Sequence, residues 1–316
     1  MRRLLLTILL SSVGSALAWP TKPVTFVVPY PPGGGTDVIA RIVQEPLAKQ
    51  LGQPIVIENR GGAGGSVGTA VAARATPDGH TMLFTLSSHS INPAIYARLP
   101  FDTERDFRPV SLVASLPQLF AVNPAAPYKT FRDLVDFMKM NPGKIDYASV
   151  GVGSPSHIAG ELLKMRLHSY MVHIPYRGGG PAVAATIAGD VPLLVVSIPA
   201  AMSQVRAGRL RPLAVSTLKR TEILPEVPTV AEATGLKDYE VDSWYAVFAP
   251  AKAPDEAVAK MNKAIAVAVQ QSDIKAKLLQ QGAEGLSSTP ERLGQMVSRE
   301  ITQWRAVVKH AKIEGE

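Results

Sequence analysis

The sequence predicts an α/β fold of two lobes, each built on a parallel-type sheet flanked by helices, with a ligand cleft between the lobes. A buried apolar strand, a glycine-rich turn and a helix follow one another at the start of the chain. The same succession recurs in both halves of the sequence, which is the pattern of parallel sheets. Two apolar segments, at 111–122 and 240–249, interrupt it and are interpreted as crossings between the lobes.

The first of these units spans Val24 to Asp37. Val24 to Val28 is nearly continuously apolar, as in a strand buried on both faces. Pro29 to Gly35 cannot continue the strand, because its three prolines donate no ladder hydrogen bond and its glycines permit positive φ. Thr36 is predicted to cap the helix that follows, in which Pro46 predicts a kink. Such a turn either presents backbone N–H groups to an anion or is an ordinary tight turn.

Recurrence favours the anion-binding alternative. Further strands are predicted at 55–57, 81–85, 145–150, 172–175, 193–197 and 213–216. Turns rich in glycine or serine end the strands at 30–36, 60–66, 86–92, 149–156, 176–181 and 197–199. Ligands of open parallel sheets bind outside the carboxyl ends of the strands. A cleft lined by these turns would be rich in N–H and hydroxyl donors, which suits a small carboxylate.

The first 18 residues are predicted to be a secretory signal peptide. Arg2 and Arg3 precede the apolar stretch Leu4 to Leu10, and Ala16-Leu17-Ala18 fits the small-x-small cleavage rule. Cleavage would lower the formal net charge from +7 to +5, since the segment carries two arginines (7 − 2). No later stretch approaches the roughly 20 apolar residues of a membrane span, so the mature chain is not expected to be embedded in a membrane.

Composition excludes several kinds of chemistry. The chain has no cysteine, so it has neither disulfides nor cysteine-based metal or nucleophile sites. Its six histidines lack metal-ligand spacing, and no nucleotide-binding motif is present. Aromatic residues make up only 6%, which argues against base-stacking surfaces. The sequence therefore predicts no metal, no cofactor, no catalytic residue and no nucleic-acid partner.

Some residues leave alternatives open. Gly64 to Gly68 spells G-x-S-x-G, the nucleophile-elbow pattern of hydrolases, although several glycines separate its serine from the strand ending near Glu58. Trp244 either packs at a hinge or covers an aromatic ligand. Arg177 either meets a carboxylate or is a solvated loop cation.

Several longer stretches resemble the Bug-type solute receptors of tripartite tricarboxylate transporters. The resemblance covers essentially the whole mature chain, in order. It rests on P-V-T-F-V-V-P-Y-P-P-G-G-G-T-D at 23–37, L-G-Q-P-I-V-I-E-N-R-G-G-A-G-G at 51–65, H-S-I-N-P-A-I-Y at 89–96, P-G-K-I-D-Y-A-S-V-G-V-G at 142–153, M-V-H-I-P-Y-R-G at 171–178 and P-E-V-P-T-V-A-E-A at 225–233.

This resemblance implies a periplasmic binding protein of type II, with residues 19–116 plus 243–316 as one lobe and 117–242 as the other. It also implies a small carboxylate held by backbone amides, hydroxyls and waters. The residues implied to line the site, together with the two candidates Arg177 and Ser197, are Tyr30, Gly33, Gly34, Gly35, Ser87, Ser88, His89, Ser149, Gly153, Ser154, Arg177 and Ser197.

One departure from the family pattern bears on the ligand. Many relatives have Phe-Asp-Asn after the strand at 193–196, and that acid can pair a ligand ammonium. Here the stretch is Val196-Ser197-Ile198, which favours a carboxylate without an amino group, possibly an aromatic one. The resemblance further implies a periplasmic monomer that delivers its ligand to the membrane subunits of a transporter. A receptor that presents ligand to a sensor kinase is the alternative.

Overall fold

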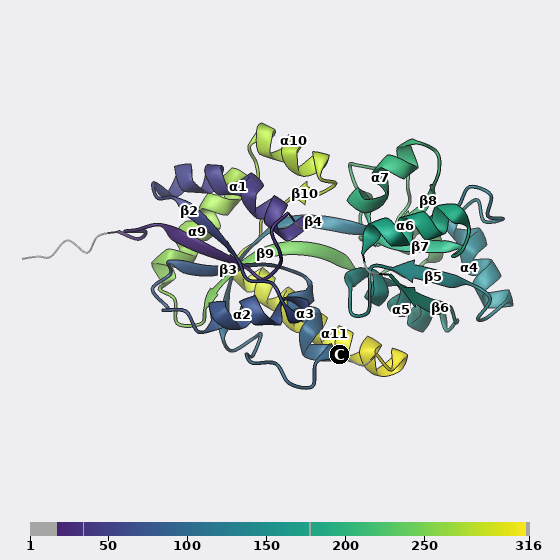
Figure 1. The fold of residues 1–316 in the computed structure, drawn as a ribbon, viewed down its shortest axis with the longest axis horizontal. Helices are drawn as coiled ribbons and strands as arrows, with labels where there is room; N and C mark the ends of the chain where they lie inside the picture. The colour runs from purple at the N-terminus through teal and green to yellow at the C-terminus, as the bar shows by residue number, and fades with distance from the viewer. Residues whose placement is uncertain (1–17, 34, 177, 314–316) are drawn as a thin grey trace, which may run out of the picture.

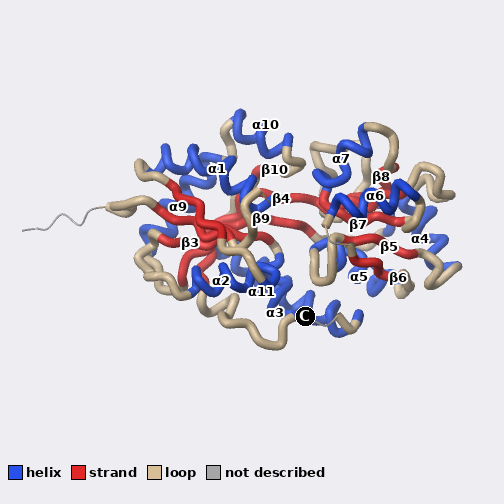
Figure 2. The backbone as a smooth tube through the Cα atoms, in the orientation of Figure 1, coloured by secondary structure: helices blue, strands red, loops and turns tan. Residues whose placement is uncertain are grey.

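A computed structural model describes residues 18–33, 35–176 and 178–313, in which two sheets lie side by side and are joined by two long strands (Figure 1). Helices cover both faces of each sheet (Figure 2). The predicted signal peptide falls almost entirely outside the described residues. None of the helices in the described ranges is long and apolar enough to cross a membrane.

The first sheet has the strand order β2-β1-β3-β9-β4, with β10 paired to β4. β1 is parallel to both β2 and β3, whereas β9 is antiparallel to β3 and β4. The strands are β1 (Val24–Val28), β2 (Ile55–Asn59), β3 (Thr81–Leu86), β4 (Phe107–Val122), β9 (Asp242–Pro250) and β10 (Glu284–Gly285). The helices around it are α1 (Gly35–Leu51), η1 (Ala63–Gly65), α2 (Ser66–Ala73), α3 (Ser88–Ile95), α9 (Asp255–Ala268), α10 (Ser272–Gln280) and α11 (Pro290–Ala311).

The second sheet contains the parallel strands β6-β5-β7, and β7 pairs with the last part of β4 in antiparallel fashion. β8 pairs with the same part of β4. The strands are β5 (Asp146–Ser149), β6 (Val172–Pro175), β7 (Leu193–Ser197) and β8 (Arg211–Val215). The helices are α4 (Phe131–Met140), α5 (Pro155–Leu167), α6 (Gly179–Ala188), α7 (Ile198–Arg206) and α8 (Val230–Thr234).

Strand β4 belongs to both sheets. It pairs with β9 from Phe107 to Pro117 and with β7 from Gln118 to Val122. The sequence predicts a crossing between the lobes at 111–122, and the structure has one strand of 16 residues there, which continues through Pro117. Pro117 lies where the pairing of β4 with β9 ends and its pairing with β7 begins. A proline is tolerated there because its missing N–H falls at the end of each ladder and not in the middle of one.

Helix α11 packs into the cores of both sheets. Leu293, Val297 and Ile301 lie in the core that contains Trp244 and Phe248. One to two turns further on, Trp304, Val307 and Val308 lie in the core of the second sheet. The lobe boundaries at 116/117 and 242/243 stay a prediction, and α11, which the prediction assigns to the first lobe, contributes to both cores.

The start of α1 differs from the prediction. The helix begins at Gly35, so Thr36 is its second residue and the predicted cap at Thr36 is wrong. The carboxylate of Asp37 instead accepts hydrogen bonds from the Gly33 N–H (2.8 Å), from Arg41 Nε (3.0 Å) and from Asn59 Nδ2 (3.1 Å). These bonds keep the pKa of Asp37 low despite burial, whose opposing effect is the largest single contribution. The helix continues through Pro46.

Substitution of Gly160 by alanine tests the packing of α5 on β5. A Cβ atom on Gly160 would lie 2.3 and 2.4 Å from ring atoms of Tyr147, which is fully buried. Gly160→Ala is expected to lower the free energy of unfolding by about 1–3 kcal/mol, because a packed core resists extra volume. Gly180→Ala is the control, since nothing lies within 4 Å of its Cβ position in α6. Equal urea midpoints for the two variants would contradict this account of the contact.

Candidate ligand-binding site

Parallel strands bring helix starts together at one edge of each sheet. In the first sheet, β1 and β3 are parallel neighbours and lead into α1 and α3. In the second, β5, β6 and β7 lead into α5, α6 and α7. A Cβ atom on Gly153, in the loop after β5, would lie 2.6 Å from Cδ1 of Ile95 at the end of α3. The two edges therefore lie close together. The candidate site lies between these edges.

Tyr30 and Ser88 are joined on the first side of the site. Tyr30 follows β1 and Ser88 begins α3, and their hydroxyl groups form a hydrogen bond. Burial raises the pKa of Tyr30, so the phenol stays protonated. Tyr245 of β9 is also close, since a Cβ on Gly35 would lie 2.9 Å from its hydroxyl oxygen. In the sequence, the only signal for Tyr245 is its position in the crossing segment 240–249.

The glycine turn after β1 is partly described. Gly33 is exposed, has a φ of +77° and donates its N–H to Asp37, so a residue with a side chain would be strained there. Gly35 is exposed at the first position of α1. Gly34 and Arg177 lie outside the described residues, and their predicted roles stay predictions.

His89 lies within an aromatic cluster. Its ring is 4.6 Å from that of Phe248, 5.1 Å from Phe107 and 6.3 Å from Phe101, measured between centroids. The residue is 2% exposed, and neither ring nitrogen has a hydrogen-bond partner among the described residues. Burial lowers the pKa of His89 to about 3. The ring therefore serves the packing of this cluster, and the structure adds no support for its predicted contact with a ligand.

Ser87 occupies the N-cap position of α3 without forming a side-chain cap. Its hydroxyl is buried and has no partner within the described ranges. Ser197 holds the same position in α7, and Gly178 in α6, again without a side-chain cap. The first N–H groups of a helix have no acceptor inside the helix, and the helix dipole favours an anion there. Three helix starts near the site are thus left without a side-chain cap.

The predicted hydroxyls of the second side already have partners. Ser149 Oγ accepts the Gly151 N–H at 3.1 Å and lies 2.6 Å from Nε2 of His173. Ser154 Oγ donates to the Gly151 carbonyl at 2.6 Å and accepts the His157 N–H at 3.2 Å, which caps α5. Both side chains therefore shape the loop itself. Within this loop, Val152 stands out because it is 52% exposed.

Trp244 is buried at the crossing. Its Nε1 donates to the carboxylate of Glu300 on α11 at 3.0 and 3.1 Å, and Ser90 Oγ donates to the same carboxylate at 2.6 Å. Burial raises the pKa of Glu300 to about 7. Of the two predicted roles of Trp244, the structure shows packing at the crossing.

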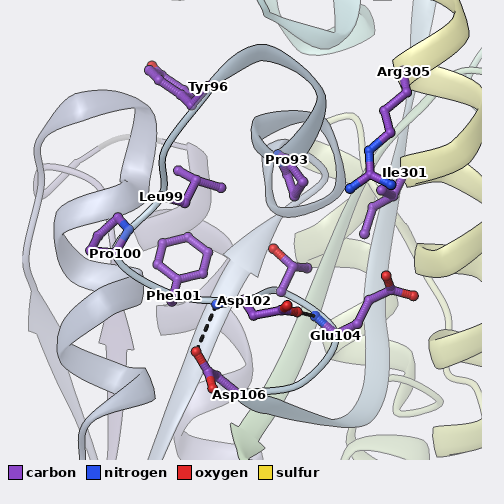
Figure 3. A pocket seen from close by; sticks show the side chains of 11 residues that line it. Pro93, Tyr96, Leu99, Pro100, Phe101, Asp102, Glu104, Asp106, Ile301 and Arg305 are labelled. Carbon is purple, nitrogen blue, oxygen red and sulfur yellow. Dashed lines mark hydrogen bonds between the residues drawn. The ribbon is translucent and has the colours of Figure 1, made fainter.

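Two cavities lie away from the predicted residues. One of about 990 Å³ is lined by Asp242, Trp244, Glu300 and residues of α11. Another, of about 530 Å³, lies between α3 and α11, with Pro93 and Arg305 on one side and Asp102 on the other (Figure 3). None of the predicted site residues lines either cavity.

The G-x-S-x-G motif is explained by packing. Ser66 begins α2 and is buried, and among the residues that the structure describes it forms no hydrogen bond with a histidine. A Cβ on Gly68 would lie 2.4 Å from the Arg60 carbonyl oxygen and 2.7 Å from Pro29 Cα. The described part of the chain also shows no cluster of three or more metal-ligating side chains.

Comparison with known proteins identifies relatives along nearly the whole chain. A family model described as the tripartite tricarboxylate transporter family receptor, TctC, matches residues 39–313. The chain is 37% identical to the UPF0065 protein in the tcbD-tcbE intergenic region of Pseudomonas sp. (strain P51), over 94% of this chain and 89% of the relative. It is 34% identical to protein BugT of Bordetella pertussis, over 93% and 91% respectively.

Solved structures show the same fold. Periplasmic binding protein BugD has a TM-score of 0.75 at 33% identity, covering 94% of this chain and all of that one. R. palustris Rpa4515 with adipate has a TM-score of 0.78 at 34% identity, covering 94% and 99%. MatC (Rpa3494) from Rhodopseudomonas palustris with bound malate has a TM-score of 0.73 at 34% identity, covering 92% and 100%. The predicted two-lobed α/β fold of a periplasmic binding protein is confirmed.

The burial of His89 predicts a pH dependence of stability. Its pKa is about 3 in the folded protein and near 6.5 when unfolded, so the unfolded chain binds a proton first as the pH falls. The contribution of neutral His89 to the free energy of unfolding is therefore fully present above pH 6.5 and is lost progressively as the pH falls toward 3. Between pH 8 and pH 5, wild type should lose about 2 kcal/mol more than His89→Phe, as measured by urea unfolding. Equal losses in the two proteins would contradict the prediction.

Proposed function

Because the chain belongs to the tripartite tricarboxylate transporter receptor family, we propose that it captures a small carboxylate in the periplasm for the membrane subunits of such a transporter. The family resemblance predicted from the sequence is thereby confirmed, and the chain is a solute-binding protein of the TctC type. The observation that carries the ligand class is the helix-start edge of each sheet, where α3, α6 and α7 begin without side-chain caps.

Two relatives support the ligand class. The Rpa4515 structure contains adipate and the MatC structure contains malate, and both proteins are 34% identical to this chain. Adipate and malate each carry two carboxylates and no amino group. An anion at a helix start receives hydrogen bonds from backbone N–H groups and is favoured by the helix dipole. This is the binding mode that we propose here.

The residue at the end of β7 supports an unaminated ligand. Ser197 stands there and offers a hydroxyl, where the family resemblance implies an acid in many members. A ligand ammonium would therefore lose a charged partner at this position. The proposed contact region comprises residues 30–35, 87–88, 149–154, Arg177 and Ser197, with Tyr245 added from the structure.

The remaining parts of the proposal follow from the family. BugD is a periplasmic binding protein 33% identical to this chain, and we propose that this chain likewise has no catalytic activity and acts as a monomer. Export would depend on the predicted signal peptide at 1–18. Presentation of the ligand to a sensor kinase is the second candidate role, in which the same site would bind the same ligand.

Thermal unfolding tests the ligand class. Adipate or malate should raise the melting temperature, since a ligand selective for the folded state contributes about 2.7 kcal/mol at a hundredfold excess over Kd. Glutamate and aspartate should raise it weakly or not at all, because Ser197 cannot pair their ammonium group. A panel of unaminated mono- and dicarboxylates, aromatic ones included, extends the test. Strong stabilisation by amino acids alone would overturn the proposal.

Arg177→Ala tests how the carboxylate is held. If backbone N–H groups at the helix starts dominate, loss of this cation should weaken binding by less than about tenfold, equivalent to about 1.4 kcal/mol. Calorimetry with the ligand found above measures the change, and Arg132→Ala, an exposed residue of α4, is the matched control. Abolished binding in the Arg177 variant alone would show a charge clamp instead.

A further inference from the structure

Two histidines hold the loop that connects β5 to α5, which spans residues 150–154. His157 lies in the first turn of α5 and His173 lies on the neighbouring strand β6. Their rings stack with centroids 3.8 Å apart and planes inclined by 11°. The ring of Tyr147 also stacks with that of His173, with centroids 4.9 Å apart. The three rings form a cluster that contacts the loop.

His157 binds the loop through one particular nitrogen. The N–H of Gly153 donates to Nδ1 of His157 at 3.1 Å. An acceptor nitrogen carries no proton, so the neutral ring has its proton on Nε2. That nitrogen lies 3.8 Å from Oε1 of Glu161, on the same face of α5. The contact with Gly153 thus requires one tautomer of a neutral ring.

His173 binds the other end of the loop. Its Nε2 lies 2.6 Å from Ser149 Oγ, and that hydroxyl also accepts the Gly151 N–H. The loop is therefore attached to one ring cluster at both ends, through Ser149 at its start and Gly153 near its end. The φ of Gly153, +73°, and that of Gly151, +130°, show that the loop depends on two unusual backbone conformations.

The surroundings keep both rings neutral. The carboxylate of Glu161 is already paired with Lys164 at 2.8 Å and accepts the Tyr147 hydroxyl at 2.7 Å. Burial lowers the pKa of His157 to about 3 and that of His173 to about 4, and the nearby Lys164 charge acts in the same direction. The hydrogen bond from Gly153 is thus kept over the whole range from neutral to mildly acidic pH.

We propose that His157 and His173 are positioning residues of the carboxylate site, which fix the conformation of the loop at 150–154 at the edge of that site. The proposal rests on the function proposed above. Neither ring needs to touch the ligand. Without the His157 acceptor, the Gly153 N–H of this partly buried loop would lose its side-chain partner, and the loop would lose a contact that holds Gly153 beside Ile95.

Two substitutions at His157 distinguish the effect of the hydrogen bond to Gly153 from the effect of side-chain volume. His157→Asn keeps an acceptor oxygen where Nδ1 lies, whereas His157→Leu removes it and keeps an apolar side chain. We expect the leucine variant to bind adipate or malate, whichever wild type binds, about tenfold more weakly, and the asparagine variant to recover most of that loss. His173→Gln and His173→Leu form the corresponding pair. His310→Leu, on the exposed side of α11, is the control.

Amide exchange of Gly153 and the ¹⁵N shifts of His157 give a readout that needs no ligand. In wild type, Nδ1 should be unprotonated and Nε2 protonated at pH 7, and the Gly153 amide should be protected in wild type and in His157→Asn but not in His157→Leu. Unchanged protection in His157→Leu would overturn the inference, and so would equal loss of affinity in the asparagine and leucine variants. If the amide follows the prediction and wild type binds no carboxylate, the proposed ligand is wrong instead.

Discussion

The hydrogen-bond ladder of β4 is the constraint on which the rest of the molecule depends. Its first part pairs with β9 in one sheet and its last part pairs with β7 and β8 in the other. Because β4 takes part in both ladders, it sets the direction in which the strands of each sheet run and relates the two sheets through its own twist. The parallel strands of each sheet then bring their carboxyl ends, and the helix starts behind them, to facing edges. The proposed site is thus a consequence of strand connectivity before any side chain is considered.

The fold was predictable because its signals are local. Apolar runs such as Val24–Val28 and turns such as 30–36 are set by residue type, since proline and glycine end strands whatever surrounds them. The continuity of β4 through Pro117 was not predictable in this way, because it depends on which strand pairs with each half. The same holds for α11. Its apolar spacing predicts a helix, but nothing in the spacing says that Ile301 and Trp304 enter different cores.

The candidate site was predictable only in part, for the same reason. The sequence places Ser149, Gly153 and Ser154 at the end of a strand or in the turn after it, and the structure has them there. Their hydrogen-bond partners come from residues that are distant in sequence or hidden within a helix, such as His173 and His157. A hydroxyl in a turn is therefore a poor guide to whether it is available to a ligand. His89 shows that a polar residue predicted to lie beside a cleft can instead be buried, because three phenylalanine rings enclose it.

The two sides of the site are stabilised by different means, and α11 connects them. On the first side, the hydroxyls of Tyr30 and Ser88 bond to each other, and the acid Asp37 holds the turn. On the second side, the neutral imidazole rings of His157 and His173 hold the loop at 150–154. Glu300 of α11 accepts hydrogen bonds from Ser90 of α3 and Trp244 of β9, and Trp304 follows one turn later in the second core. Together with β4 and β9, α11 is a third connection between the sheets. Rotation of one sheet against the other must therefore bend this helix or carry it along.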